Sequence, residues 1–447
     1  MKGILVVLDG VADLPTRQLE DKTPLEAAET PNLDFLAARS QMGYMDPVKP
    51  GFIPESDEAT VSIFGNDLIN STRGQLEARG ADIKLVRGDL ALRANFATID
   101  SPSKGNILDR RGGRTLTTAE AEILSKALNK ITLPRKFIFK STIQHRGVLV
   151  LKGGFSDNIS GNDYAYLKGK AGDSDKIGTF KALDDEENTQ YTVNILKEFL
   201  DKAFMVLDKH PINEARRRKG LLPVNYLLMR GAGIETPKLK YYKKWLSVAY
   251  MPLEIGFSKV CGMKVFSFDY PRLKSLDSYQ NLREGLEKAC GFSVKVLKKN
   301  HKNFDYAYIH IKETDLPGHD NMPFEKKSMI EYIDKTLFDF LRRFCPPNKI
   351  KIVVTADHST PCKLKAHSAD PVPVLFYNNQ PPRAGGMFGI TGFLRTASQR
   401  IPFYPKRNSP PPEDQKKVIK FCEKNARHGS LGRITGKELF EKVGFTK

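Results

Sequence analysis

Three apolar runs in this chain each end in residues that can bind a metal ion. The runs span residues 3–8, 304–310 and 350–355. Their nearly continuous apolar character is typical of strands that are buried on both faces of a parallel sheet. Open α/β sheets place their sites at the carboxyl ends of the strands, so we expect the residues after the runs to share one site. These residues are Asp9 after the first run, Asp315 and His319 after the second, and Asp357 and His358 after the third.

The types and spacing of these side chains favour metal chemistry. Asp315 and His319 lie four positions apart, which lets a carboxylate and an imidazole on one helical face contact the same cation. His367 follows His358 by nine residues and adds another imidazole. Taken singly, such residues are more often helix caps or ordinary polar residues, and His310 is interpreted as a strand residue beside the site. Their recurrence at successive strand ends predicts a metal site.

Ser56 is the candidate nucleophile. A Pro- and Gly-rich loop over residues 46–56 leads to the start of a predicted helix over residues 57–64. Backbone N–H groups and the dipole at a helix N-terminus favour an anion such as phosphate. A serine hydroxyl beside two metal ions with Asp and His ligands forms a phosphoryl-transfer site, because the ions lower the pKa of the hydroxyl and offset charge in the transition state.

The sequence pattern divides the chain into a core and an insert. Between residues 74 and 235, strand patterns joined by Arg- and Gly-rich turns are followed by a long helical pattern. We predict an α+β domain at 74–235 that interrupts an α/β core formed by 1–73 and 236–447, with a mainly parallel sheet flanked by helices. The predicted elements of the insert are strands at 91–99, 136–140 and 147–152 and a helix at 187–209.

The composition argues against a membrane protein and a disulfide framework. No apolar run among the 447 residues approaches the ~20 needed to span a bilayer, and the N-terminus lacks a signal-peptide pattern. Five scattered cysteines without a CxxC pair favour a reducing, cytoplasmic setting. The net charge of +19 is interpreted as a lysine-rich solvated surface. Steering of an anionic substrate and nucleic-acid binding at residues 295–302 are the alternatives, although the latter segment has no interleaved aromatic residues.

Longer motifs resemble a known family. Motifs of the alkaline phosphatase superfamily are similar to residues 9–10, 23–28, 30–34, 56–57, 315–321 and 356–360. More narrowly, the chain resembles the archaeal type of cofactor-independent phosphoglycerate mutase. The narrower match rests on residues 93–98, 109–114, 145–146, 210–214, 225–233 and 367–373. The resemblance implies an alkaline-phosphatase-like fold. It also implies a glycolytic isomerase that interconverts 3-phosphoglycerate and 2-phosphoglycerate through a phosphoserine, without 2,3-bisphosphoglycerate.

The resemblance also implies roles for individual residues. One divalent ion would be held by Asp9, Ser56, Asp357 and His358, and the other by Asp315, His319 and His367. Mn²⁺, Mg²⁺ and Zn²⁺ are the candidates, and mixed N and O ligands favour Mn²⁺ or Zn²⁺. Guanidinium groups of the insert would bind the substrate's phosphate and carboxylate. The substrate-binding candidates are Arg110, Arg111, Arg114, His145, Arg146, Asn162 and Arg230. Asp109 and Asp163 are candidates for orienting or deprotonating the glycerate hydroxyls, and Lys259 for protonating the serine leaving oxygen.

The chain also departs from the family pattern. Glu55 and Thr60 stand near Ser56 where the family usually has Gly and His, and the basic, Pro-rich region 376–431 differs as well. Two other functions stay open. One is a metal-dependent phosphohydrolase, or a mutase of another phosphosugar, in the same superfamily. The other is a basic nucleic-acid-binding or scaffold protein on a decayed enzyme fold, which the presence of every metal-ligand type argues against.

Overall fold

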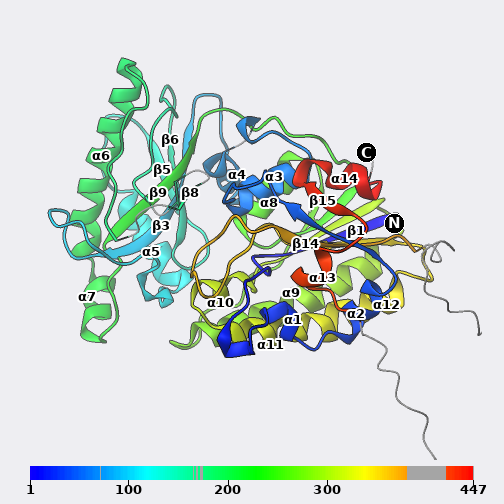
Figure 1. Cartoon of the computed structure of the whole chain (residues 1–447). Helices are drawn as coiled ribbons and strands as arrows, with labels where there is room; N and C mark the ends of the chain where they lie inside the picture. The colour runs from blue at the N-terminus through cyan, green and yellow to red at the C-terminus, as the bar shows by residue number, and fades with distance from the viewer. Residues whose placement is uncertain (71, 165, 168–169, 172–174, 380–418, 446–447) are drawn as a thin grey trace, which may run out of the picture.

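The computed structural model describes residues 1–70, 72–164, 166–167, 170–171, 175–379 and 419–445. Most of the basic, Pro-rich region at 376–431 lies outside these residues. Figure 1 shows a larger α/β unit that contains both ends of the described chain, and a smaller unit beside it that is coloured cyan and green.

The larger unit is built on an eight-stranded sheet. Five adjacent strands, β11, β10, β12, β1 and β13, run parallel to one another. Strand β14 is antiparallel to both of its neighbours, β13 and β2, and the edge strand β15 is parallel to β2. Strands β1, β12 and β13 are buried along nearly their whole length, which explains their continuous apolar sequences. The order across the sheet is β11 (Lys264–Phe266), β10 (Trp245–Val248), β12 (Tyr306–Ile311), β1 (Gly3–Leu8), β13 (Lys351–Thr355), β14 (Val372–Tyr377), β2 (Gln41–Asp46) and β15 (Gly432–Thr435).

The register of the three central strands aligns their carboxyl ends. Val7 of β1 pairs with His310 of β12 on one side and with Thr355 of β13 on the other. Asp9 and Asp357, each two residues beyond its paired position, therefore emerge at the same edge of the sheet. Parallel strands with aligned ends are the arrangement that we expected to gather the metal-binding side chains.

Helices cover both faces of this sheet. Figure 1 shows α3, α8 and α14 on one face and α9, α11 and α12 on the other. Apolar side chains from the sheet and the helices form one continuous core. The predicted α/β class, with a mainly parallel sheet flanked by helices, is confirmed. The bounds are α3 Ser56–Ile63, α8 Pro252–Val260, α9 Ser278–Asn300, α11 Pro323–Ile333, α12 Asp339–Phe344 and α14 Leu439–Val443.

The smaller unit has a separate antiparallel sheet and a separate core. Its central strand β3 pairs with β4, β6 and β9, and β6 also pairs with β5. Helix α6 contributes one side of the core. The bounds of the insert at 74–235 stay a prediction. The bounds are β3 Leu90–Ile99, β4 Ile107–Asp109, α5 Thr118–Leu128, β5 Phe137–Ser141, β6 Arg146–Leu151, α6 Glu187–Asp208, α7 Pro211–Arg218 and β9 Tyr226–Gly233.

Helix α4 (Arg73–Gly80) joins the two units, because it packs against α8 of the core and β3 of the insert. A Cβ atom at Gly80 would lie 1.7 Å from the carbonyl oxygen of Pro252, and one at Gly256 would lie 1.8 Å from that of Leu76. Only glycine permits the backbones to approach so closely. This packing fixes the insert against the core at the side where the central strands end.

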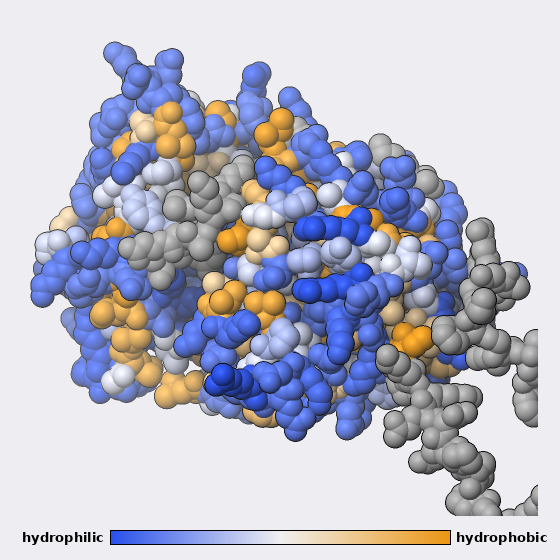
Figure 2. Space-filling view, in the orientation of Figure 1, coloured by the Kyte–Doolittle hydropathy of each residue, from blue (hydrophilic) through white to orange (hydrophobic). Residues whose placement is uncertain are grey.

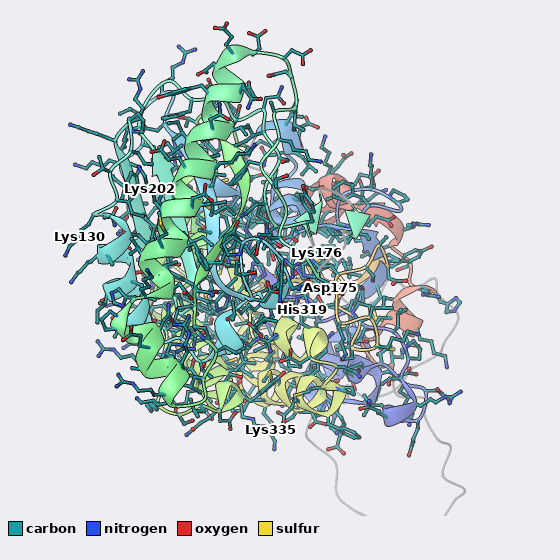
Figure 3. The ribbon with its side chains drawn as sticks, turned by 90° about the vertical axis from the view of Figure 1, so that its left-hand side faces the viewer. Lys130, Asp175, Lys176, Lys202, His319 and Lys335 are labelled. Carbon is teal, nitrogen blue, oxygen red and sulfur yellow. The ribbon has the colours of Figure 1, made fainter. Side chains whose placement is uncertain are left out.

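The surface is polar and its positive charge is spread out. Figure 2 shows a largely hydrophilic face on which hydrophobic side chains form small separate groups. In Figure 3, the labelled Lys130, Lys202 and Lys335 lie at separate places on the surface. This spread supports the interpretation of the lysines as a solvated surface. Among the described residues, no helix has the length and apolar character that a membrane span requires.

Candidate active site

A pocket lies where the carboxyl edge of the core sheet meets the insert. Its core side includes residues that the sequence predicts as nucleophile and metal ligands, and its insert side includes predicted substrate-binding residues. The former are Asp9, Ser56, Asp315, His319 and His367, and the latter are Arg111, Arg114, His145, Arg146 and Arg230.

One cluster of possible metal ligands lies at the ends of β1, β12 and β13. It contains Asp9, His310 and Asp357, which offer ligand atoms within 4.8 Å of one another. His310 Nε2 lies 3.4 Å from Asp357 Oδ2 and 3.7 Å from Asp9 Oδ2. Asp9 Oδ1, His310 Nε2 and Asp357 Oδ2 are buried and have no hydrogen-bond partner among the described residues. Two buried carboxylates and an imidazole this close together, with atoms that make no hydrogen bond, form a donor set that fits a cation.

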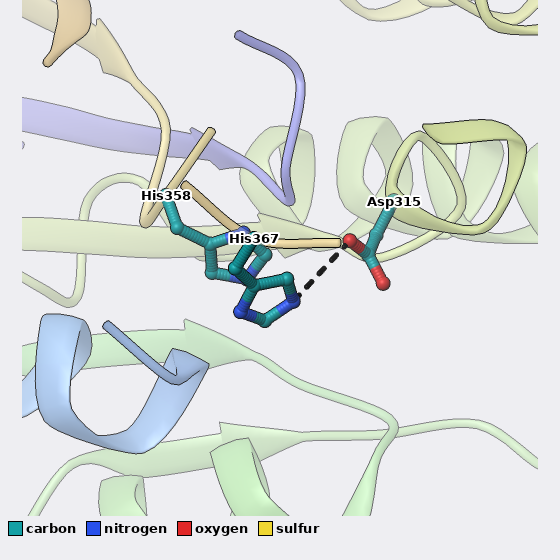
Figure 4. Close-up of side chains that lie close together, drawn as sticks. All are labelled: Asp315, His358 and His367. Carbon is teal, nitrogen blue, oxygen red and sulfur yellow. Dashed lines mark ion pairs between the residues drawn. The ribbon is translucent and has the colours of Figure 1, made fainter. Parts of the chain in front are cut away.

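The second cluster consists of Asp315, His358 and His367 (Figure 4). His367 Nε2 lies 3.8 Å from Asp315 Oδ1, and the rings of His358 and His367 stack with their centroids 3.7 Å apart. His319 lies on the other side of the carboxylate, with Nε2 3.4 Å from Asp315 Oδ2. Burial lowers the pKa of His358 to about 3 and also lowers that of His367. Both imidazoles are therefore neutral at pH 7, which is the form that binds a metal.

Neighbouring oxygen atoms orient these imidazoles. The Nδ1 atom of His358 lies 3.0 Å from Thr360 Oγ1, that of His367 lies 2.9 Å from the Pro54 carbonyl oxygen, and that of His319 lies 3.0 Å from the Lys365 carbonyl oxygen. If Nδ1 carries the proton in each ring, Nε2 is left to bind a metal. Such contacts behind the ligands are typical of histidine metal sites.

The seven predicted metal-site residues lie close together, and their division between two ions stays a prediction. The resemblance placed His358 with Asp9 and Asp357, and it left His310 outside the metal set. In the structure His310 lies with the two aspartates, and His358 can share a metal with Asp315 while its Nε2 is also 3.5 Å from Asp357 Oδ2. His358 Nε2 is also 3.2 Å from Asp9 Oδ1, so this imidazole lies between the two clusters. The position of His310 on a buried strand had suggested a structural role. Its two carboxylate partners, Asp9 and Asp357, could not be recognised because they are far away in the sequence.

Ser56 is the first residue of α3 and lies beside both clusters. Its Oγ atom is 3.3 Å from His358 Nε2 and 3.5 Å from Lys312 Nζ. The helix N-terminus adds a positive partial charge at this position. The hydroxyl is therefore placed to react with an anionic group that enters the pocket.

The lysine beside Ser56 is not the one that the sequence suggested. Lys259 pairs with Asp82 at 2.5 Å, its side chain is 39% exposed, and it does not line the pocket. Lys312 instead follows β12, pairs with Asp9, and lies 2.9 Å from Glu254 Oε1. Burial lowers the pKa of Lys312. Its place directly after an apolar strand, three residues before Asp315, was the signal that could have identified it.

The predicted insert residues have two kinds of position. The pocket is lined by Arg111, Arg114, His145, Arg146 and Arg230, whereas Asp109, Asn162 and Asp163 hold neighbouring groups in place. Asp163 pairs with Arg110 and lies 3.3 Å from Arg230 Nη1. Asn162 is buried and bonds to the backbone of β9. Asp109 Oδ1 accepts bonds from the backbone N–H groups of Arg111 (2.7 Å) and Gly113 (2.8 Å), which shapes the arginine-rich turn.

Two arginines that were not predicted from the sequence also line the pocket. Arg73 begins α4, and its Nε atom lies 2.8 Å from Glu77 Oε1. Arg93 pairs with the same carboxylate from β3. Burial lowers the pKa of Arg93 to about 9, although Glu77 opposes that shift. Arg93 and Asn95 share one face of an otherwise apolar strand, and this alternation was a usable signal.

Comparisons with known proteins identify the relatives of this chain. The family model described as 2,3-bisphosphoglycerate-independent phosphoglycerate mutase matches residues 37–213, and that of the metalloenzyme superfamily matches residues 275–401. A mutase of that name from Pyrococcus furiosus is 38% identical over 442 residues, which cover 98% of this chain and 95% of the relative. Another from Thermococcus kodakarensis is 39% identical over 383 residues, with coverage of 84% and 87%.

Solved structures give the same result. A Pyrococcus horikoshii protein matches with a TM-score of 0.68 and 29% identity, covering 100% of this chain and 98% of that one. A cofactor-independent phosphoglycerate mutase from Thermoplasma acidophilum matches with a TM-score of 0.53 and 27% identity, covering 100% and 99%. The chain therefore belongs to the family of 2,3-bisphosphoglycerate-independent phosphoglycerate mutases.

Proposed function

We propose that this protein interconverts 3-phosphoglycerate and 2-phosphoglycerate through a phosphoserine at Ser56. One observation carries the proposal. A single pocket is lined by a serine hydroxyl and members of two Asp/His clusters on its core side and by several guanidinium groups on its insert side. The first set suits phosphoryl transfer, and the second suits a small ligand with a phosphate and a carboxylate.

Two divalent ions are part of the proposal. Asp9, His310 and Asp357 would hold one, and Asp315, His358 and His367 the other, with His319 and Ser56 as further ligands. Mn²⁺ and Zn²⁺ suit these mixed N and O donors, and Mg²⁺ is the third candidate. When bound, the ions supply positive charge that makes the serine hydroxyl more acidic and offsets charge on the phosphoryl oxygens.

The residues of the chain divide the reaction into two transfers. In the first, Ser56 Oγ forms a bond to phosphorus while the bond from phosphorus to the glycerate oxygen breaks. In the second, the other glycerate hydroxyl takes the phosphoryl group back from Ser56. The phosphate stays on the protein between the steps, so free 2,3-bisphosphoglycerate is not needed. Glycerate must stay bound meanwhile, and we assign this role to the pocket arginines.

Asp163 and Lys312 are assigned supporting parts. Asp163 pairs with Arg110 and lies 3.3 Å from Arg230 Nη1, so it orients the Arg230 guanidinium that lines the pocket. Lys312 takes the role first suggested for Lys259, protonation of the serine leaving oxygen, since its ammonium lies 3.5 Å from Ser56 Oγ.

The proposed compartment is the cytoplasm, because the five buried free thiols fit a reducing environment.

Replacement of the nucleophile tests the proposal. Ser56→Ala should abolish turnover of 3-phosphoglycerate in an enolase-coupled assay with added Mn²⁺, and far-UV circular dichroism should show an intact fold. Wild-type protein incubated with substrate should gain one phosphoryl group in intact-mass spectrometry, and peptide mapping should place it at Ser56. Ser103→Ala, which changes an exposed serine of the insert, is the matched control.

Two outcomes would contradict the proposal. Substantial mutase activity in Ser56→Ala, or a phosphoryl group at another residue, would refute the nucleophile. A free-phosphate assay run in parallel distinguishes the alternative activity, because release of phosphate at the full rate of turnover would identify a phosphohydrolase.

A further inference from the structure

The residue next to the nucleophile is itself an anion bound to two arginines. Glu55 precedes Ser56, and its Oε2 atom lies 2.7 Å from Arg73 Nη1 and 2.9 Å from Arg230 Nη2. All four side chains line the pocket. Arg73 begins α4, whereas Arg230 comes from β9 of the insert. A carboxylate from the core thus lies between guanidinium groups that belong to two different elements.

We propose that Arg73 and Arg230 form an anion-binding subsite of the pocket, which the Glu55 carboxylate fills until a ligand's phosphate or carboxylate displaces it. The geometry of a carboxylate oxygen shared by two guanidinium groups is that of a bound anionic ligand. The Glu55 side chain is 21% exposed, more than those of Arg73 at 13% and Arg230 at 12%. It is thus the most exposed of the three, although its side chain also accepts from the backbone N–H of Glu58 in the capping box of α3, a bond that displacement must break.

Displacement would not leave either arginine without a carboxylate partner. Arg73 keeps Glu77, at 2.8 Å from its Nε atom, and Asp57, at 3.2 Å from its Nη1 atom. Arg230 keeps Asp163 at 3.3 Å. The arginines are thus held in place by other residues, and the Glu55 carboxylate is the exchangeable partner. The consequence is specificity for strongly charged ligands, because an incoming anion must outcompete a tethered carboxylate.

The inference rests on the proposed function only in assuming that the ligand of the pocket is an anion. Its test needs no turnover. Inorganic phosphate is titrated into the full-length, Mn²⁺-loaded protein, and the dissociation constant is measured by calorimetry. Glu55→Gln keeps the size of the side chain and removes its charge, so phosphate should bind on the order of tenfold more tightly, equivalent to ~1.4 kcal/mol. Glu198→Gln removes the same charge from the partly exposed i,i+4 pair with Lys202 on α6, and it should leave the phosphate affinity unchanged.

Arg73→Lys tests whether the subsite itself is responsible. Lysine keeps the positive charge beside Glu77 but loses the fork that holds two oxygens. In the wild-type background this change should alter phosphate affinity little, because Glu55 already occupies the guanidinium. In the Glu55→Gln background, Arg73→Lys should reverse most of the gain in phosphate affinity. Such non-additivity is expected only if the two residues share one site.

The outcomes separate this inference from the proposed function. Unchanged or weaker phosphate binding in a folded Glu55→Gln protein would overturn the inference, because the carboxylate would then merely position the arginines. Mutase activity with that result would leave the proposed function intact. Tighter phosphate binding by Glu55→Gln, together with a wild-type protein that has no mutase activity, would support the subsite and refute the mutase proposal.

Discussion

Arg111 enters the pocket from the arginine-rich turn after β4, and it lines the same cavity as Ser56. A mutase must hold glycerate after its phosphate has moved to the serine, whereas hydrolysis of a small aryl phosphate needs only the nucleophile and the metal site. Loss of one guanidinium from a desolvated anion site costs on the order of 2–5 kcal/mol. Arg111→Ala should therefore lower mutase turnover by ~30-fold to several thousandfold, at ~1.4 kcal/mol per tenfold, and aryl phosphate hydrolysis far less.

The fraction of free phosphate should also rise in Arg111→Ala, because glycerate escapes before the second transfer. Arg217→Ala is the matched control, since Arg217 lies on α7, pairs with Asp208 and has a 40% exposed side chain. Equal losses in both assays would instead place Arg111 in structural support of the insert.

Single residues also differ in how well the sequence predicted them. Asp315 and His358 were predicted because ligands directly after apolar strands form a pattern visible along the chain. Lys312 and Glu254 were not, because each acquires its meaning from a partner far away in the sequence. Lys312, for example, lies beside Asp9 only because β12 pairs with β1. Such neighbours depend on the order of strands in the sheet, which local patterns do not contain.

At the scale of elements, strands β1, β12 and β13 were predictable because burial on both faces requires continuous apolar residues. The amphipathic pattern of α6 was equally clear, and its structure spans Glu187–Asp208 against a predicted 187–209. The antiparallel strand β14 and the edge strand β15 were not predicted individually, because their pairing partners come from both ends of the chain. Helix α4 was also missed as a joint between the units, since this role depends on its contact with α8.

The short helix α13 (Glu423–Ala426) attaches the C-terminal segment to the N-terminal one through a carboxylate. Glu423 accepts hydrogen bonds from the backbone N–H of Asp13 (3.0 Å) and from Thr23 Oγ1 (2.7 Å). Burial raises the pKa of Glu423 to about 7 from 4.5. The folded protein therefore binds more protons than the unfolded chain between these pH values, so this group lowers stability as pH rises through them.

Glu423→Gln should accordingly match the wild-type free energy of unfolding at pH 4.5 and exceed it at pH 8. The difference at pH 8 should be on the order of 3 kcal/mol, at ~1.4 kcal/mol per pKa unit. Denaturant unfolding at the two pH values measures this, with the exposed Glu441→Gln of α14 as the control. A variant that is less stable than wild type at both pH values would show that the carboxylate's hydrogen bonds outweigh the cost of its burial.

At the scale of the whole molecule, the two Asp/His clusters connect segments that are far apart in the chain. Asp9 comes from the first strand, whereas Asp315, Asp357 and His367 come from the C-terminal half of the core. Ions bound at these clusters would therefore stabilise the arrangement of the entire core sheet. A ligand that binds only the folded state adds ~2.7 kcal/mol of stability at a concentration 100 times its dissociation constant.

The chelator-treated protein should therefore unfold at a lower temperature than the protein with excess Mn²⁺, and calorimetry should show the transition rising with Mn²⁺ concentration. Asp357→Asn makes the prediction sharper. Asn keeps the oxygen that accepts from the backbone N–H groups of Gly10 and His358, both at 3.1 Å, but removes the charge of Oδ2, which lies 3.4 Å from His310 Nε2. This variant should gain less stability from Mn²⁺ than wild type does, because a charged ligand is lost. Asp339→Asn, in the partly exposed pair with Arg343 on α12, should leave the Mn²⁺ response unchanged. A full Mn²⁺ response in Asp357→Asn would exclude that carboxylate from the metal site.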